Sequence, residues 1–166
     1  MCAKGRDLWS SIIYKKMAFD DTILNDFNAT VERLRTSINE SIRTSVDQNK
    51  TVIKTMQTDE QMYQGINASG NSIRPDYADS TINYKKRNFQ PYDRVTLKDS
   101  GDFYDSIEIE ARTDDFVIST QITYSIYLVT KYAEILGITD TNLQTFVNTY
   151  TIPIIKQSFN DIIAES

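Results

Sequence analysis

The stretch DSGDFYDSIEIEARTDDFVISTQI, residues 99–122, decides the fold class of this chain. From residue 106 to residue 112 apolar and charged side chains alternate, and an alternation returns over residues 116–122. This period of two predicts a pair of antiparallel strands, with residues 113–115 as the turn between them. Because an isolated hairpin is unstable in water, other elements must cover its apolar face.

A tight corner leads into the first of these strands. Asp99 stands where the N-cap of a single helical turn would stand, and Gly101 allows the backbone to bend sharply. We expect Asp99 and Gly101 to set the geometry of this turn. Leu97, Phe103 and Ile107 are expected to pack it against the sheet.

Helical spacing dominates the chain before the corner. Residues 1–20 are expected to form an arm or a short helix, because they contain the apolar stripe Leu8, Trp9, Ile12 and Ile13. Residues 21–64 are expected to be helical, in two pieces. Over 21–46 apolar residues recur every three or four positions, which favours a core-packing helix over a coiled coil, and 51–64 form the second piece. Residues 65–98 are expected to be a loop followed by a basic segment.

Residues 124–166 return to helical spacing after the hairpin. The first helix there is expected to end at Gly137 as its C-cap. The last helix is expected to be capped by Asp140 or Thr141 and to be kinked or divided at Pro153. Residues 1–166 are therefore expected to form one α+β domain. In it, a long N-terminal amphipathic helix and C-terminal helices pack on a small antiparallel sheet.

Composition narrows the available chemistry. The 166 residues are 40% hydrophobic and 25% charged, as in an ordinary soluble domain. Histidine is absent, which removes the commonest general base and transition-metal ligand, and the only cysteine is Cys2. No segment has the character of a signal peptide or approaches the roughly 18 apolar residues of a membrane span. We expect no enzymatic activity, no cofactor, no metal and no membrane contact.

Charge is distributed unevenly along the chain. The net charge of −5 divides into +2 over residues 1–100 and −7 from residue 101 onward. A basic segment with interleaved aromatic residues precedes the corner, and its members are Tyr84, Lys85, Lys86, Arg87, Tyr92, Arg94 and Lys98. We favour a solvated loop over a nucleic-acid patch, although such tyrosines also suit base stacking or a protein interface. The two oppositely charged parts suit head-to-tail packing of identical subunits.

Three acidic residues around the corner are the best candidates for chemistry. Asp99, Asp102 and Asp105 could in principle serve a metal site or a carboxylate-dependent hydrolase. Their spacing of three, however, differs from the alternate-position ligands of a calcium loop. It suits one face of a helical turn, so we favour a cap and solvated or ion-paired carboxylates.

Four spaced patterns occur in succession before and through the corner. They are Gln61-x-x-x-Gly65, Ala68-Ser69-Gly70-Asn71-x-Ile73-x-Pro75, Tyr77-x-x-x-Thr81-x-x-x-Lys85 and Val95-Thr96-Leu97-Lys98-Asp99-Ser100-Gly101-Asp102-Phe103-Tyr104-x-Ser106-Ile107. This succession resembles the tail-completion and head-to-tail connector proteins of tailed phages, over about residues 55–137. The Gly-Asp-Phe-Tyr version is most similar to sequences from crAss-like phages of Bacteroides-type hosts.

The resemblance implies a structural protein of the virion, made in the cytoplasm of a host bacterium. Such proteins form a ring of identical subunits in the neck beneath the portal, between portal or adaptor proteins and tail proteins. The corner would then belong to a docking surface, and the basic segment would contact neighbouring subunits or DNA in the channel. A small nucleic-acid-binding protein and, less favoured, a carboxylate-dependent hydrolase are the alternatives.

Overall fold

The structure of the protein is a computed structural model that describes residues 21–113 and 115–164. The chain divides between Arg35 and Thr36 into two compact units, which are described separately. The arm or short helix expected over residues 1–20 lies outside the described residues, as does Asp114 in the expected turn.

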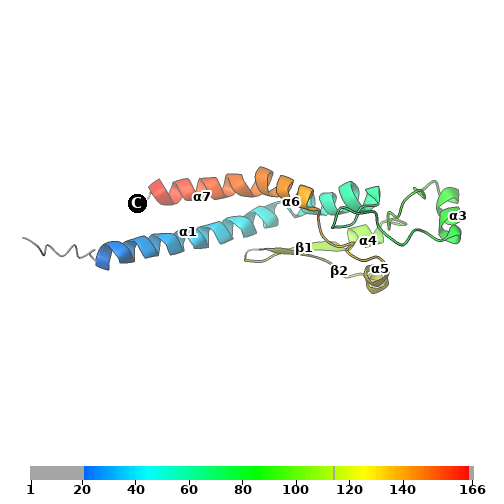
Figure 1. The fold of residues 1–166 in the computed structure, drawn as a ribbon, viewed down its shortest axis with the longest axis horizontal. Helices are drawn as coiled ribbons and strands as arrows, with labels where there is room; N and C mark the ends of the chain where they lie inside the picture. The colour runs from blue at the N-terminus through cyan, green and yellow to red at the C-terminus, as the bar shows by residue number, and fades with distance from the viewer. Residues whose placement is uncertain (1–20, 114, 165–166) are drawn as a thin grey trace, which may run out of the picture. The chain divides into compact units, whose positions relative to one another are not determined.

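Helices make up most of the described chain, around a single pair of strands (Figure 1). The elements are α1 (Asp21–Gln48), α2 (Lys50–Thr55), the π-helix η1 (Met56–Gln61), the 3₁₀-helix η2 (Met62–Gln64), α3 (Asp79–Arg87), α4 (Asp102–Asp105), β1 (Ile107–Ala111), β2 (Phe116–Thr120), α5 (Ser125–Lys131), α6 (Asp140–Phe146), the π-helix η3 (Val147–Thr151) and α7 (Ile152–Ala164). The α+β prediction is confirmed, including the long N-terminal helix and the C-terminal helices.

The first unit contributes the beginning of α1 to the described chain. Apolar side chains of this part, Ile23, Leu24, Phe27 and Val31, are each exposed by 43% or more. The second unit, residues 36–166, contains the rest of α1 and every other element.

The hairpin of the second unit is the predicted antiparallel pair of strands. β1 and β2 pair antiparallel, with Ile107 opposite Thr120 and Ile109 opposite Ile118. Ile107 and Ile109 are buried whereas Glu108 between them is exposed. The period-two prediction is confirmed for β1, whereas all five residues of β2 are half-buried and show no alternation in burial.

The core lies between this hairpin and helices from both ends of the second unit. Its buried apolar side chains are Val46, Ile53, Met56, Met62, Ile73, Val95, Phe103, Tyr104, Ile107, Ile109, Tyr132, Ile135 and Phe146. The ring of Phe146 lies 6.5 Å from that of Phe116 on β2, centroid to centroid, and 5.3 Å from that of Tyr150. The C-terminal helices therefore pack on the small sheet.

Hydroxyl pairs join α1 to the last helical run within the second unit. Ser45 Oγ and Thr151 Oγ1 are buried and 2.9 Å apart, and Ser41 Oγ lies 3.0 Å from Ser158 Oγ. Small hydroxyl side chains allow two helices to approach closely while their polar atoms remain paired. No described helix has the length and apolar character that crossing a bilayer requires.

The loop after α5 corrects the prediction that Gly137 is a helix C-cap. α5 ends at Lys131, because buried Tyr132 adopts an extended conformation with φ −117° and ψ 96°. Gly137 lies six residues later with φ 134°, where a Cβ atom would come within 2.9 Å of the Cβ of Ala68. Its glycine is required by a close approach of two loops and not by the end of a helix.

The start of the last helix also differs from the prediction. Thr139, rather than Asp140 or Thr141, is the N-cap, and its side chain accepts a hydrogen bond from the amide of Asn142. Near Pro153 the helix changes form without breaking, as the π-helix η3 immediately precedes α7. The wider π turn provides room for the proline ring, which would otherwise clash with a carbonyl one turn earlier.

The interval 65–98 is more ordered than the expected loop and basic segment. It contains α3, and Ile66 forms an isolated antiparallel bridge with Ser72 ahead of it. In the second unit, α3 lies at the end that is remote from α7 (Figure 1). The lysines and the arginine of the basic segment that close α3 therefore sit at a helix C-terminus, where the helix dipole favours cations.

Candidate functional site

The segment 95–98, just ahead of the corner, is held by the hydroxyl groups of two tyrosines. Tyr77 Oη accepts hydrogen bonds from the amides of Thr96 and Leu97, each at 3.0 Å. Tyr104 Oη donates to the carbonyl of Thr96 at 2.5 Å. Burial is the main cause that raises the pKa of Tyr104, which keeps its phenol protonated as a donor. Thr96 is fully buried, so the segment satisfies its backbone through side chains instead of a sheet ladder.

The corner itself packs as predicted. Phe103 and Ile107 belong to the core, and Leu97 packs against it. Leu97 has φ 55° and Gly101 has φ 108°, so two left-handed residues reverse the chain within five positions. The amide of Thr96 and that of Leu97 share the Tyr77 oxygen, which holds Leu97 in a backbone conformation that leucine rarely adopts.

The prediction that Asp99 caps the helical turn is wrong. Gly101 is the N-cap of α4 and no side chain caps it. Asp99 instead accepts a hydrogen bond from Gln90 Nε2 at 3.2 Å, and its carbonyl accepts one from the same amide group at 3.2 Å. The left-handed glycine provides the bend by itself, which frees the Asp99 carboxylate to join the corner to the loop after α3.

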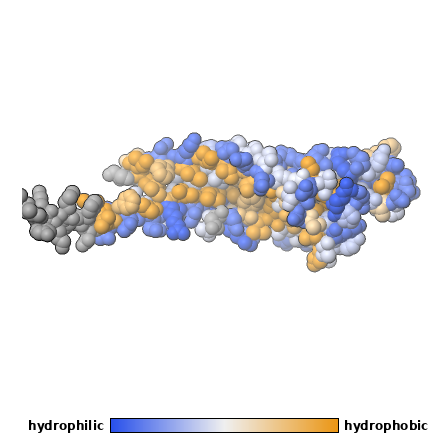
Figure 2. All heavy atoms as spheres, viewed as in Figure 1, coloured by the Kyte–Doolittle hydropathy of each residue, from blue (hydrophilic) through white to orange (hydrophobic). Residues whose placement is uncertain are grey.

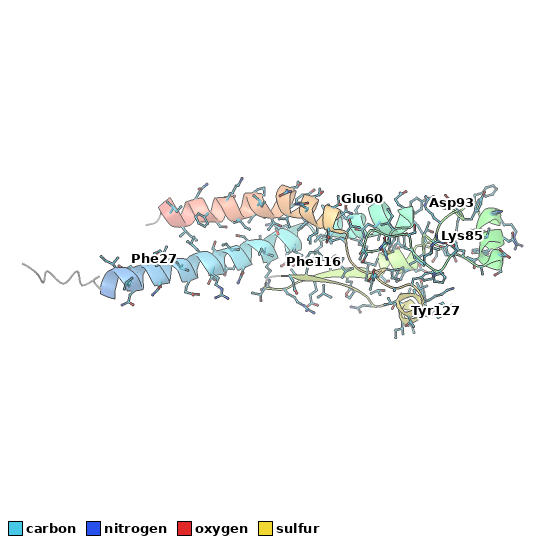
Figure 3. The ribbon with its side chains drawn as sticks, in the orientation of Figure 1. Phe27, Glu60, Lys85, Asp93, Phe116 and Tyr127 are labelled. Atoms are coloured by element: carbon cyan, nitrogen blue, oxygen red, sulfur yellow. The ribbon has the colours of Figure 1, made fainter. Side chains whose placement is uncertain are left out.

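Lys85 is a buried cation and not an exposed member of the basic segment. Its side chain faces the interior of the unit from α3 (Figure 3), and the residue is 4% exposed. Lys85 Nζ donates to Gln90 Oε1 at 3.0 Å and to the carbonyl of Lys98 at 2.7 Å, and it lies 5.2 Å from the ring centroid of Tyr77. The structure therefore corrects the assignment of Lys85 as a contact for neighbours or DNA.

Several other cations of the segment lie against tyrosine rings of the same chain. Lys86 Nζ is 4.7 Å from the ring centroid of Tyr92, and Lys98 Nζ lies 5.4 Å from that of Tyr63. Arg94 Nε donates to the carbonyl of Tyr63 at 2.8 Å. The interleaving of cations and aromatics, which also suited base stacking, serves cation–π contacts inside this fold.

A groove of about 400 Å³ opens beside the corner, between α3, α4 and α5. We call it the tyrosine groove, because its lining includes Tyr77, Tyr84, Tyr124, Tyr127 and Tyr132. Asp99 and Asp102 line it as well, with Lys131. Tyr127, at its edge, points away from α5 into solvent (Figure 3).

The acidic side chains of the tyrosine groove contribute to raising the pKa of two of its tyrosines. A hydrogen bond with Asp99 and the charge of that carboxylate raise the pKa of Tyr84. Partial burial raises the pKa of Tyr124, with smaller contributions from Asp102 and Asp99. Both phenols therefore remain protonated donors, and the groove offers rings, hydroxyl donors and carboxylates to a partner.

The three acids that might have served a hydrolase are divided between two surfaces. Asp99 and Asp102 line the tyrosine groove, whereas Asp105 lines a separate hollow beside α2. The described residues contain no group of three or more acidic or cysteine side chains suited to a metal ion. The three carboxylates therefore do not all line one groove.

Two buried glutamines are structural residues that the sequence pattern did not single out. Gln57 Nε2 donates to the carbonyl of Ile135 at 2.7 Å, and its Oε1 accepts from the amide of Gly137 at 2.7 Å. Gln61 Oε1 accepts from the amide of Thr139 at 2.9 Å. The available signal was a pair of glutamines four residues apart in a predicted helix, with Met56 and Met62 on either side, since one helix face then presents both amides.

A larger, apolar groove of about 690 Å³ lies elsewhere on the second unit. We call it the apolar groove, and α1, β2, the loop after α5, α6, η3 and α7 line it with Ile42, Val46, Phe116, Val117, Ile118, Leu136, Ile138, Leu143, Phe146, Val147 and Ile155. Asp115 is a charged residue at its border. Figure 2 shows apolar surface gathered over and beside α7.

Comparison with protein-family models, with curated proteins and with solved structures yields no match to this chain.

Proposed function

We propose that this chain is a structural virion protein of a tailed phage, which forms a ring in the neck beneath the portal and offers a docking surface to tail proteins. The proposal rests on the spaced sequence patterns of residues 55–137 and on the surface of the described chain. The proposed function includes no catalytic activity.

The observation that carries the proposal is the amount of exposed apolar surface. Large apolar side chains are exposed on several elements, among them Phe27 on α1 at 64%, Ile126 on α5 at 76% and Ile163 on α7 at 61%. The apolar groove adds a concave surface of the same character. Scattered single residues would be ordinary, but an open groove together with exposed helix faces is typical of a protein that is covered by partners.

The rigid corner supports a docking role. Hydrogen bonds with Tyr77 and Tyr104 hold the backbone at Thr96 and Leu97, and one from Gln90 holds the carbonyl of Asp99. The tyrosine groove beside it presents carboxylates and several tyrosines, and tyrosine is common at protein interfaces because it combines apolar area with a directional hydrogen bond. Such a preorganised surface loses little conformational entropy when a tail protein binds.

The test is the location of the chain in phage particles. Purified virions of the phage that encodes it are expected to contain the protein, and antibody labelling in electron micrographs is expected to mark the junction of head and tail. A virion that lacks the protein, or labelling confined to the capsid shell or the tail tip, would contradict the proposal. A matched control is an antibody against a major capsid protein, which should label the head alone.

A further inference from the structure

Phe89 is the most exposed large apolar side chain of the described residues. It follows α3 and is 98% exposed, although a phenylalanine side chain normally gains considerable free energy by leaving water. Lys86 and Arg87, both exposed, lie just before it in the chain. We call Phe89 with these two cations the basic knob.

The backbone conformation at Phe89 also disfavours phenylalanine at this position. Its amide donates to the carbonyl of Lys86 at 3.3 Å, and the amide of Gln90 donates to the carbonyl of Lys85 at 2.9 Å. These two bonds form the Schellman motif that ends many helices, with Phe89 at its left-handed position, φ 55°. Glycine or asparagine is favoured there, so both the local backbone and the solvent disfavour phenylalanine. Phe89 is disfavoured both by its left-handed backbone and by its exposure to water, which indicates that its side chain contacts another molecule.

The apolar groove is a complementary surface on the same molecule. It is lined by aliphatic and aromatic side chains, and the acidic residue Asp115 lies at its border. All its lining residues except Ile42 and Val46 belong to the part of the sequence that carries −7, whereas the knob belongs to the part that carries +2. The groove is lined by residues of β2 and α6, and in the second unit these two elements lie away from α3 (Figure 1). One chain therefore cannot place its own knob in its own groove without refolding.

We propose that the basic knob of one copy inserts Phe89 into the apolar groove of a second copy, with Lys86 and Arg87 facing Asp115. Two different surfaces meet in such a contact, so it is heterologous and can repeat from copy to copy to close a ring. The inference deepens the proposed function, on which it rests for the ring itself, by naming the subunit contact. Charge complementarity selects a second copy as the occupant.

Substitutions at Phe89 separate self-association from folding. Phe89→Gly and Phe89→Asn both suit the left-handed backbone, so their melting temperatures should equal or exceed that of the unchanged protein. Their self-association, measured by sedimentation velocity on the full chain, should weaken by about tenfold or more, because one buried aromatic side chain is lost per contact. Phe89→Trp should retain association. Ile126→Ala, which removes an exposed apolar side chain outside knob and groove, is the matched control and should leave association unchanged.

A mixing experiment identifies the groove as the receptor. Leu143, 39% exposed on α6, lines the groove, and Leu143→Lys would place a cation against the basic knob while keeping a good helix former. Each variant alone should be monomeric. A mixture of Phe89→Gly and Leu143→Lys should form one-to-one dimers, because the first supplies an intact groove and the second an intact knob.

Three results would overturn the inference. They are an unchanged protein that stays monomeric up to millimolar concentration, a Phe89→Gly variant that associates normally, and monomers that persist in the mixture. These results leave the proposed function standing if virions contain the chain at the neck. Conversely, knob-dependent association with no chain in virions would refute the neck assignment and support the contact.

Discussion

Lys85 shows how a residue that looks like part of a charged patch can be a structural centre. Its ammonium group connects α3 to the loop at Gln90 and to the carbonyl of Lys98, next to the ring of Tyr77. A buried cation needs such partners, since an ammonium group without hydrogen bonds is costly in a dry environment. Two of the segments that meet at Lys85, α3 and the residues around Lys98, also line the tyrosine groove.

Replacing Lys85 tests this role. Lys85→Met retains most of the apolar stem but leaves Gln90 Oε1 and the Lys98 carbonyl without their donor. We expect the free energy of unfolding in urea to fall by about 1–3 kcal/mol. Lys86→Met is the matched control on the next residue, which is exposed, and it should change stability by less than about 0.5 kcal/mol. Equal effects of the two substitutions would contradict the internal role of Lys85.

At the scale of secondary-structure elements, the contact between α1 and the last helical run depends on hydroxyl groups. Ser45 Oγ donates its only hydrogen to the carbonyl of Ile42 at 2.7 Å, so the hydroxyl of Thr151 must be the donor in their 2.9 Å contact. Both residues are buried, and every buried polar side-chain atom of the described residues has a partner. The helix pair is therefore specified by polar matching in addition to apolar burial.

A double-mutant cycle tests this pairing. Ser45→Ala removes the acceptor of a buried hydroxyl and should lower the free energy of unfolding by about 1–3 kcal/mol. Thr151→Val removes the donor, while Ser45 keeps its bond to Ile42, so the loss should be only about 0.5–1.5 kcal/mol. Because the double variant leaves no unpaired hydroxyl, its loss should be smaller than the sum by at least about 0.5 kcal/mol, measured by urea unfolding. Strict additivity would show that the two hydroxyl groups do not interact.

Stability of the whole molecule should depend on pH in the alkaline range. Burial raises the pKa of Tyr104, so the folded phenol keeps its proton where an unfolded tyrosine, with an ordinary pKa near 10, loses it. The unfolded state then binds fewer protons, and the free energy of unfolding decreases as pH rises above about 10. The contribution of Tyr104 is fully present below that value.

Urea unfolding at several pH values measures this effect. Between about pH 8 and 9 Tyr104 should cause no change of the free energy of unfolding with pH, and above about pH 10 the free energy should decline by about 1.4 kcal/mol per pH unit for this group. Tyr104→Phe should have a shallower decline, although it also loses the hydrogen bond to Thr96. Equal alkaline slopes for the two proteins would mean that another group is responsible.

The sequence by itself determined the features that depend on local periodicity. The alternation around Ile107 and Ile109 assigned both faces of β1, because a period of two depends only on neighbouring residues. The spacing of three and four over α1 located the longest helix for the same reason. The packing of Phe103 beneath the corner followed from an apolar residue next to a required bend.

Only the tertiary structure decided the features that depend on which distant segments are in contact. Asp99 is a residue type that often caps helices, and it lies where a cap was expected. Gly101 is nevertheless the N-cap, and the Asp99 carboxylate accepts a hydrogen bond from Gln90, nine residues away. Lys85 and Phe89 stand four positions apart in one polar stretch, and nothing local indicates that the cation is buried and the phenylalanine exposed. Burial is a property of the assembled fold, because it is set by residues distant in sequence that local patterns cannot report.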